Sequence, residues 1–139
     1  MLTGKVVVQR LVTEVLNGGH LELVDQLYAP AQAEEARAWI GAFRTSFPDV
    51  HMDIVELIAE PAPAGTGKET VVGRFTCSGT HTGTWRGHPP TGRRFENIDE
   101  VGIYRITGGR ITDSWTLEDT LTRLRHLALP APDAVETRS

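Results

Sequence analysis

VHMDIV, residues 50–55, is the stretch at which the hydrophobic period of this chain changes. Val50, Met52 and Ile54 alternate with their neighbours, and this two-residue rhythm is typical of a β-strand. Before this stretch, apolar residues recur every three or four positions, as they do on one face of a helix. Helices followed by strands is the order of an α+β fold rather than of repeated βαβ units.

Three helices are predicted ahead of that stretch. The first covers residues 5–16 and ends at NGG, residues 17–19, because glycine readily adopts the left-handed conformation that stops a helix. The second covers residues 20–27, and Pro30 ends it because proline cannot continue a helix. The third covers about residues 32–46.

Four strands are predicted after it, at residues 50–59, 70–80, 95–106 and 110–117. Gly108-Gly109 makes a hairpin of the last two strands, and the segment 81–93, rich in glycine and proline, is expected to be a loop. A last helix is predicted over residues 117–129. We expect an antiparallel sheet that coils into a half-open cone, with helices on one face and an apolar pocket between them.

The 139 residues are about the length of one domain, which we place at residues 1–130, with 131–139 as a disordered tail. With 14 basic and 18 acidic residues, the net charge is -4, so a nucleic-acid partner is not expected. The single cysteine, Cys77, excludes a disulfide framework. The five histidines show no ligand spacing, so no metal site is expected.

Two further absences in the sequence bear on location. No run of about 18 apolar residues is present, so we expect no membrane-spanning helix. The N-terminal apolar run turns polar at Gln9-Arg10, too early for a signal peptide. We therefore expect a soluble cytoplasmic protein without a membrane partner.

Two segments carry a resemblance to a known family. The first is GTHTGTWRGHPPTGR, residues 79–93, and the second runs from YRITGGRI at residues 104–111 to SWTLED at residues 114–119. Both resemble the SnoaL-like polyketide cyclases, a branch of the NTF2-like superfamily. The order and length of the predicted N-terminal helices are similar too, so the resemblance covers nearly the whole chain.

The resemblance implies an NTF2-like, cone-shaped half-barrel that forms a homodimer through its sheet and needs no metal or organic cofactor. Members of the family close a ring of anthracycline-type polyketides, in antibiotic biosynthesis, by an intramolecular aldol condensation. Their general acid/base is an aspartate at the end of the last strand, which matches Asp119 here. A histidine about fourteen residues earlier in those cyclases is replaced by Arg105, and this departure puts the aldol reaction itself in question.

Asp119 has two interpretations. As a catalytic base it would be buried beside Trp115, and burial would raise its pKa toward neutrality. However, TLED, residues 116–119, also matches the capping-box pattern of a helix start, where Asp119 would only complement the helix N-terminus. The two roles compete, because a helix N-terminus lowers the pKa of a carboxyl group.

Arg105 is the second candidate catalytic residue. Strict alternation along the predicted strand 95–106 places it on one face with Asn97, a candidate substrate contact, and directs both toward the pocket. There the guanidinium could hold an enolate or a carboxylate. The alternative is a cross-strand pair with Asp113 or Asp99.

Four more residues are candidate substrate contacts. His81 could donate to a substrate carbonyl, although a structural ring bonded to the loop backbone is the alternative that we favour. Trp39 and Phe43 lie on one stripe of the third predicted helix, where they could be core, pocket wall or both. Trp115 is expected to shelter Asp119 from water.

Three functions stay open from the sequence. The favoured one is a cofactor-independent cyclase that closes a ring in an enolisable polyketide by acid/base chemistry. The second is another reaction in the same pocket, such as isomerisation or epoxide hydrolysis by two acids and an arginine, a pattern that Asp99, Arg105 and Asp119 satisfy only loosely. The third is a non-catalytic small-molecule-binding domain, because the fold alone does not determine the reaction.

Overall fold

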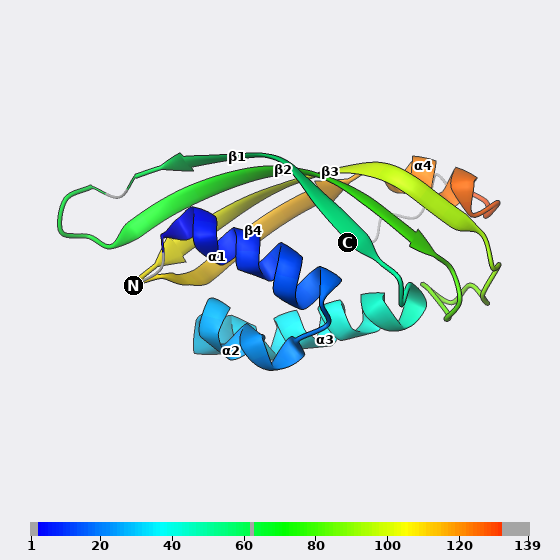
Figure 1. The fold of residues 1–139 in the computed structure, drawn as a ribbon, viewed down its shortest axis with the longest axis horizontal. Coiled ribbons are helices and arrows are strands. Elements are labelled where there is room, and N and C mark those ends of the chain that lie inside the picture. Colours follow the sequence, from blue (N-terminus) through cyan, green and yellow to red (C-terminus); the bar gives the residue numbers. More distant parts are fainter. Residues whose placement is uncertain (1–2, 62, 132–139) are drawn as a thin grey trace.

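The structure is a computed structural model that describes residues 3–61 and 63–131. Its helices come first, except for a short one at the C-terminal end, and a sheet of four strands follows (Figure 1). The helices are α1 (Gly4–Arg10), η1 (Leu11–Asn17), η2 (Leu21–Leu23), α2 (Val24–Leu27), α3 (Pro30–Ser46) and α4 (Thr120–His126). The strands are β1 (His51–Glu60), β2 (Lys68–Thr80), β3 (Arg94–Thr107) and β4 (Arg110–Glu118).

The first two helical elements form the rod predicted over residues 5–16, with one difference in its winding. Thr3 caps α1 through its side chain, and η1 continues α1 with the wider turns of a π-helix. Gly19, with φ of +77°, supplies the left-handed stop that the glycine pair predicts. η1 matters for function because Leu11 and Leu16 point from it toward the large cavity.

Pro30 has a different role from the one expected. It does not merely end the second helix but occupies the first turn of α3, after the N-cap Ala29. Proline suits that position because its ring presets the helical φ and its missing N–H has no partner to lose there. The third helix therefore begins two residues earlier than predicted.

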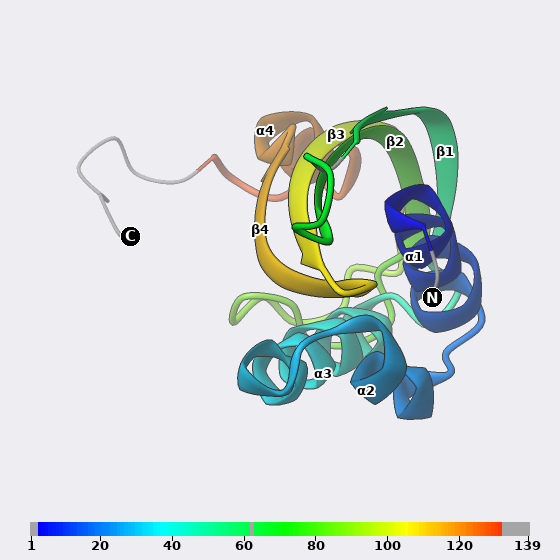
Figure 2. The same ribbon diagram turned by 90° about the vertical axis from the view of Figure 1, so that its left-hand side faces the viewer.

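The sheet is antiparallel throughout, in the order β1-β2-β3-β4. Gly108 and Gly109 close the β3–β4 hairpin with φ values of +60° and +81°, which only glycine adopts without strain. Figure 2 shows the strands curving over α1, while α2 and α3 close the concave side. The expected α+β cone is thus confirmed, with α4 at the end of the sheet opposite the N-terminus (Figure 1).

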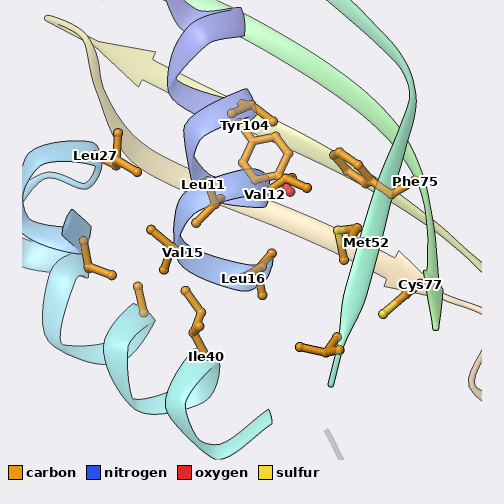
Figure 3. Close-up of a cluster of buried hydrophobic side chains, with 14 of the residues drawn as sticks. Leu11, Val12, Val15, Leu16, Leu27, Ile40, Met52, Phe75, Cys77 and Tyr104 are labelled. Carbon is orange, nitrogen blue, oxygen red and sulfur yellow. The ribbon is translucent and has the colours of Figure 1, made fainter. Parts of the chain in front are cut away.

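One hydrophobic core fills the space between helices and sheet. The apolar face of η1 packs there against α3 and the inner side of the strands (Figure 3). Its members include Val12, Val15, Leu27, Ile40, Met52 and Phe75. This core holds η1 and α3 in place as walls of the cavity described below.

A β-bulge in β3 decides which residues face that core. The β2–β3 register shifts between Cys77 and Gly79, and Asn97 on β3 adopts a left-handed φ of +50°. The extra residue reverses the inward and outward positions beyond it. Phe95 points inward before the bulge, and after it the inward residues are Ile98, Glu100, Gly102, Tyr104 and Ile106.

The segment predicted as a tail falls almost wholly outside the described residues. Of residues 131–139, the structure describes residue 131 alone. The helix predicted over residues 117–129 is shorter, because β4 continues to Glu118 and α4 covers Thr120–His126.

Candidate active site

A cavity of about 740 Å³ lies between the concave side of the sheet and the helices. α3 lines one wall and β3 and β4 line the opposite one, while the loop between β2 and β3 adds Thr84, Trp85 and Arg86. This volume is within the range of cavities that hold drug-sized molecules. A smaller cavity of about 330 Å³ lies near the β3–β4 turn.

Aromatic rings form the helical side of the large cavity. Trp39 and Phe43 line it from α3, and Trp85 lines it from the β2–β3 loop. Phe47, at the end of α3, packs edge-on against Trp85 at 5.6 Å between ring centroids and thereby supports the wall from behind. Such flat apolar surfaces suit a ligand that itself contains rings.

Two carboxylates face the cavity from the sheet side. Glu100 on β3 and Glu118 on β4 are directly paired in the register of the two strands. Both line the cavity, with side chains that are 15% and 28% exposed. Cross-strand pairs of like charge are unfavourable unless a cation compensates them.

Arg123 is that cation. It projects from α4 with a fully buried side chain, and its Nη2 lies 3.1 Å from Oε2 of Glu100, while Nη1 contacts Glu118. Its guanidinium also stands over the ring of Phe95, at 4.7 Å, and within 5.3 Å of the Phe43 ring. Ion pairs and cation–π contacts together hold this charge in one place.

The electrostatics of the cluster raise the pKa of Glu100. Burial raises the pKa of Glu100, and Arg123 opposes this only in part. Burial likewise lowers the pKa of Arg123, against the attraction of Glu100. One guanidinium serves two carboxylates here, so the cluster retains a net negative charge when all three groups are ionised. We conclude that Glu100 titrates above its ordinary range, which is what a general base in a cavity needs.

Hydroxyl groups complete the polar side of the cavity. Tyr28 and Tyr104 line it together with Ser114 and Thr116. Burial raises the pKa of both tyrosines, so both keep their protons at neutral pH and can act as hydrogen-bond donors. The cavity thus holds a candidate base, several donors and an aromatic wall.

The predicted site residues divide into two groups. Trp39 and Phe43 line the cavity, as expected for substrate contacts. Five others are absent from its lining: His81, Asn97, Arg105, Trp115 and Asp119.

Asp119 occupies the position of a helix cap. It is the N-cap of α4, and its carboxylate accepts hydrogen bonds from the backbone N–H and the hydroxyl of Thr122, at 3.1 and 2.7 Å. The expectation that burial beside Trp115 raises its pKa is wrong. The bonds from Thr122 lower the pKa of the exposed Asp119 instead, because they stabilise the ionised form.

Arg105 and Asn97 are placed differently from the strand prediction because of the bulge. Arg105 points to the outer face of the sheet, where its Nη1 donates to Oγ1 of Thr70 at 2.8 Å and where it lines only the smaller cavity. Asn97 is exposed at the bulge itself, and its N–H donates to Oγ of Ser78. The expectation that both point toward the pocket assumed strict alternation, which the bulge interrupts.

His81 is buried in the way the structural alternative describes. Its Nδ1 accepts the backbone N–H of Thr91 at 3.2 Å, and its own backbone pairs with Gly92 and Arg93, so it closes the base of the β2–β3 loop. Trp115 is 52% exposed on the outer face of β4, away from the cavity.

Sequence reasoning missed the cluster formed by Glu100, Glu118 and Arg123. One signal was available, since Phe95 and Ile98 are apolar at a spacing of three, which breaks strand alternation at an asparagine that tolerates a left-handed φ. No local pattern indicates that Arg123 turns into the protein, because arginine on a short amphipathic helix is usually exposed.

Within residues 3–61 and 63–131, no group of three or more His, Cys, Asp or Glu side chains is arranged to hold a metal ion. No helix in that part of the chain has the length and apolar character to cross a membrane.

Comparison with known proteins identifies relatives of this architecture. Among curated proteins, the aklanonic acid methyl ester cyclase DnrD of Streptomyces peucetius is 32% identical over 133 residues, which are 94% of this chain and 84% of DnrD. Among solved structures, wild-type IdmH from Streptomyces antibioticus matches with a TM-score of 0.71 and 26% identity, over 90% of this chain and 98% of IdmH. TsrD from Streptomyces laurentii matches with a TM-score of 0.72 and 27% identity, over 91% of this chain and 98% of TsrD.

The family follows from these matches and from the site. The cavity, with its aromatic wall and half-buried acids, has the size of a small-molecule site. The family model for the SnoaL-like polyketide cyclases matches residues 6–127, which is nearly all of the described chain. The chain therefore belongs to the SnoaL-like polyketide cyclase family.

Proposed function

We propose that this cyclase closes a ring by intramolecular aldol condensation of an enolisable polyketide ester, with Glu100 as the general base. The observation that supports this most is the environment of Glu100: it faces the cavity, burial raises its pKa, and Arg123 holds one of its carboxylate oxygens. A carboxylate of that kind is basic enough to remove a proton and dry enough to do so efficiently.

The reaction balances with the residues of this cavity. The Glu100 carboxylate takes a proton from the carbon between two carbonyl groups, and the electron pair of that C–H bond forms an enolate. The enolate carbon attacks a second carbonyl carbon, so a C–C bond forms and the π electrons of that carbonyl move to its oxygen. Protonated Glu100 then returns the proton to this alkoxide, which leaves a β-hydroxy ketone that is an isomer of the substrate.

Arg123 acts in this scheme as a positioning residue. It is buried behind the two glutamates and is not part of the cavity lining, so it does not reach a substrate. Its contact with Glu100 fixes the direction of the carboxylate, while Glu118 takes a share of the positive charge. Sharing the cation in this way leaves Glu100 more basic than a carboxylate in an exclusive ion pair.

The test is turnover of aklanonic acid methyl ester, the compound in the name of the relative DnrD. Glu100→Gln should lower kcat by about 10²–10⁴-fold, the usual contribution of a general base. Asp119→Asn is the matched control, because it removes a nearby carboxylate that caps α4 outside the cavity.

The same assay decides between the two acids. The catalytic role that the family resemblance implies for Asp119 stays a prediction, and a large loss in Asp119→Asn with little loss in Glu100→Gln would establish it in place of this proposal. Circular dichroism of both variants separates a catalytic loss from unfolding.

A second candidate reaction has a specific observation in its favour. Glu100, Arg123 and Glu118 form a carboxylate–guanidinium–carboxylate set, although not from the residues expected. In an epoxide hydrolase, one acid protonates the epoxide oxygen as its C–O bond breaks, and the other takes a proton from the attacking water. Incubation with styrene oxide in ¹⁸O-water tests this, because hydrolysis gives a diol that carries one labelled oxygen.

The outer face of the sheet supports the proposed homodimer. Ile58, Val72, Ile103 and Trp115 are neighbours in register across all four strands, and Ile58 and Trp115 are more than half exposed. An apolar row of this kind is typical of a face that packs on another surface. Light scattering should give a dimer for the native chain and a monomer for Trp115→Glu. A cytoplasmic location remains a prediction of the sequence.

A further inference from the structure

Two glycines face each other at the centre of the sheet, and each is covered by an aromatic ring. Gly73 on β2 pairs with Gly102 on β3. A Cβ placed on Gly73 would lie 2.3 Å from the ring of Phe75, and one placed on Gly102 would lie 2.8 Å from both the ring and the hydroxyl oxygen of Tyr104. Each ring therefore folds back along its own strand over a position that has no side chain.

The two rings differ in what they present to the cavity. Phe75 and Tyr104 meet edge-on, with centroids 6.5 Å apart and planes at 81°, and both are buried. Phe75 is absent from the cavity lining, whereas Tyr104 belongs to it. Figure 3 shows the Tyr104 ring between η1 and Phe75.

The backward fold of Tyr104 sets the direction of its hydroxyl. Glu100, Gly102 and Tyr104 occupy alternate positions on the inner face of β3, after the bulge. Because the Tyr104 hydroxyl lies over Gly102, it extends from its own position toward Glu100. Tyr104 lines the cavity, so its hydroxyl is available to a ligand there.

We propose that Tyr104 is a second catalytic residue, whose hydroxyl donates a hydrogen bond to the substrate oxygen that becomes the enolate oxygen, and that Gly102 is the positioning residue that lets it do so. This inference rests on the proposed role of Glu100 as the base. When Glu100 removes the proton, negative charge develops on the adjacent carbonyl oxygen. A donor already aimed at that oxygen stabilises the charge without reorganisation.

The protonation state of Tyr104 is consistent with this role. Burial, together with the neighbouring Tyr28 and Glu100, raises the pKa of Tyr104, so the phenol keeps its proton at neutral pH. Thr70 provides the control for the loss of a hydroxyl group. It lies on β2 and is absent from the lining of the large cavity, and its hydroxyl accepts a hydrogen bond from Nη1 of Arg105.

The experiment measures only the proton-abstraction step, so that it does not depend on the natural substrate. The probe is β-tetralone in D₂O, and NMR follows deuterium exchange at the carbon between the ring and the carbonyl group. Tyr104→Phe should slow the catalysed exchange by about 10²-fold, the usual effect of losing one such donor, whereas Thr70→Val should change it by less than about threefold.

Gly102 is tested by a double-mutant cycle. Gly102→Ala should slow exchange nearly as much as Tyr104→Phe, because the new Cβ displaces the phenol. In a Tyr104→Phe background the same change should cost nothing further in exchange rate, since no hydroxyl remains to be misplaced. Gly73→Ala displaces Phe75 instead of Tyr104. The folded Gly73→Ala protein should therefore exchange at the native rate.

Each outcome bears on one claim. If Tyr104→Phe exchanges at the wild-type rate while Glu100→Gln does not exchange, the role of Tyr104 is wrong and the proposed base stands. If Glu100→Gln retains exchange and Tyr104→Phe loses it, the proposed base is wrong and the donor stands. If Gly102→Ala slows exchange equally in both backgrounds, the positioning role of Gly102 is wrong. If the native enzyme does not accelerate exchange, both proposals are wrong.

Discussion

Glu118 and Asp119 are neighbours in the chain, yet their carboxylates lie in opposite environments. Glu118 is the last residue of β4, and it faces the cavity and contacts the buried Arg123. Asp119 is exposed and bonded to the first turn of α4. The difference shows that chain position near a family motif does not determine the environment of a carboxylate. Burial and the partners that each carboxylate finds determine it.

Removal of the cation that contacts Glu100 and Glu118 should have the largest effect. Arg123→Met should lower the free energy of unfolding by about 3–5 kcal/mol, because it leaves two carboxylates without a partner in a place with little water. The loss should become smaller as pH falls through the pKa of Glu100, since a protonated Glu100 no longer needs the cation. Urea denaturation across a range of pH values measures it.

Arg125→Met is the control for that experiment. Arg125 is an exposed residue of the same helix, and replacing it should change the free energy of unfolding by less than about 0.5 kcal/mol. Equal losses in the free energy of unfolding of the two variants would mean that the buried ion cluster contributes no more to stability than an exposed arginine does.

The two acids should also differ in their effect on the pH dependence of activity. Because the pKa of Glu100 is raised and a base works only when ionised, kcat/KM should rise with pH through a pKa above 4.5, by up to about tenfold per pH unit below it. Glu100→Asp should move this profile, because a shorter side chain changes the contact with Arg123. A profile that moves instead in Asp119→Asn would assign the titration to the exposed acid.

The bulge that turns Glu100 inward can be tested through Asn97. Its φ of +50° is unfavourable for a β-branched residue, so Asn97→Val should destabilise the fold by about 1–3 kcal/mol. Asn97→Gly should be tolerated, because glycine adopts this conformation freely. If the denaturation curves of the two variants coincide, the bulge does not constrain the residue at position 97.

The smallest expected effect is the pH dependence of stability, and it has opposite signs for the two acids. The pKa of Glu100 is raised on folding, so its contribution to stability is present at low pH and is lost as pH rises through the folded-state pKa. The pKa of Asp119 is lowered, so its contribution is present above the unfolded-state pKa and is lost as pH falls. We therefore expect the free energy of unfolding of each variant, relative to that of the native chain, to change with pH between pH 3 and 7. The change should have opposite signs for Glu100→Gln and Asp119→Asn.

Much of the fold was predictable because it depends on local patterns. The change of period at Val50 indicated an α+β order, and Gly108-Gly109 indicated the hairpin. Trp39 and Phe43 were correctly placed on a cavity wall, because helical periodicity survives packing. The loop at residues 81–93 carried the family resemblance, and the family is confirmed.

The inner face of the sheet was not predictable in the same way. One extra residue at Asn97 exchanges the two faces of β3. The pairing of β3 with β2, which is distant in the sequence, stabilises this bulge. That exchange places Glu100 and Tyr104 in the cavity and Arg105 outside it.

The order of the elements, their class and the family can be inferred from the amino-acid sequence, because periodicity and turn residues act over a few positions of the chain. The burial of one acid and the choice of its arginine partner depend instead on tertiary packing. Arg123 reaches Glu100 and Glu118 because α4 packs across the end of the sheet, and the pKa of Glu100 rises because that packing removes it from water. Burial depends on contacts between segments far apart in the sequence, and no local pattern encodes them.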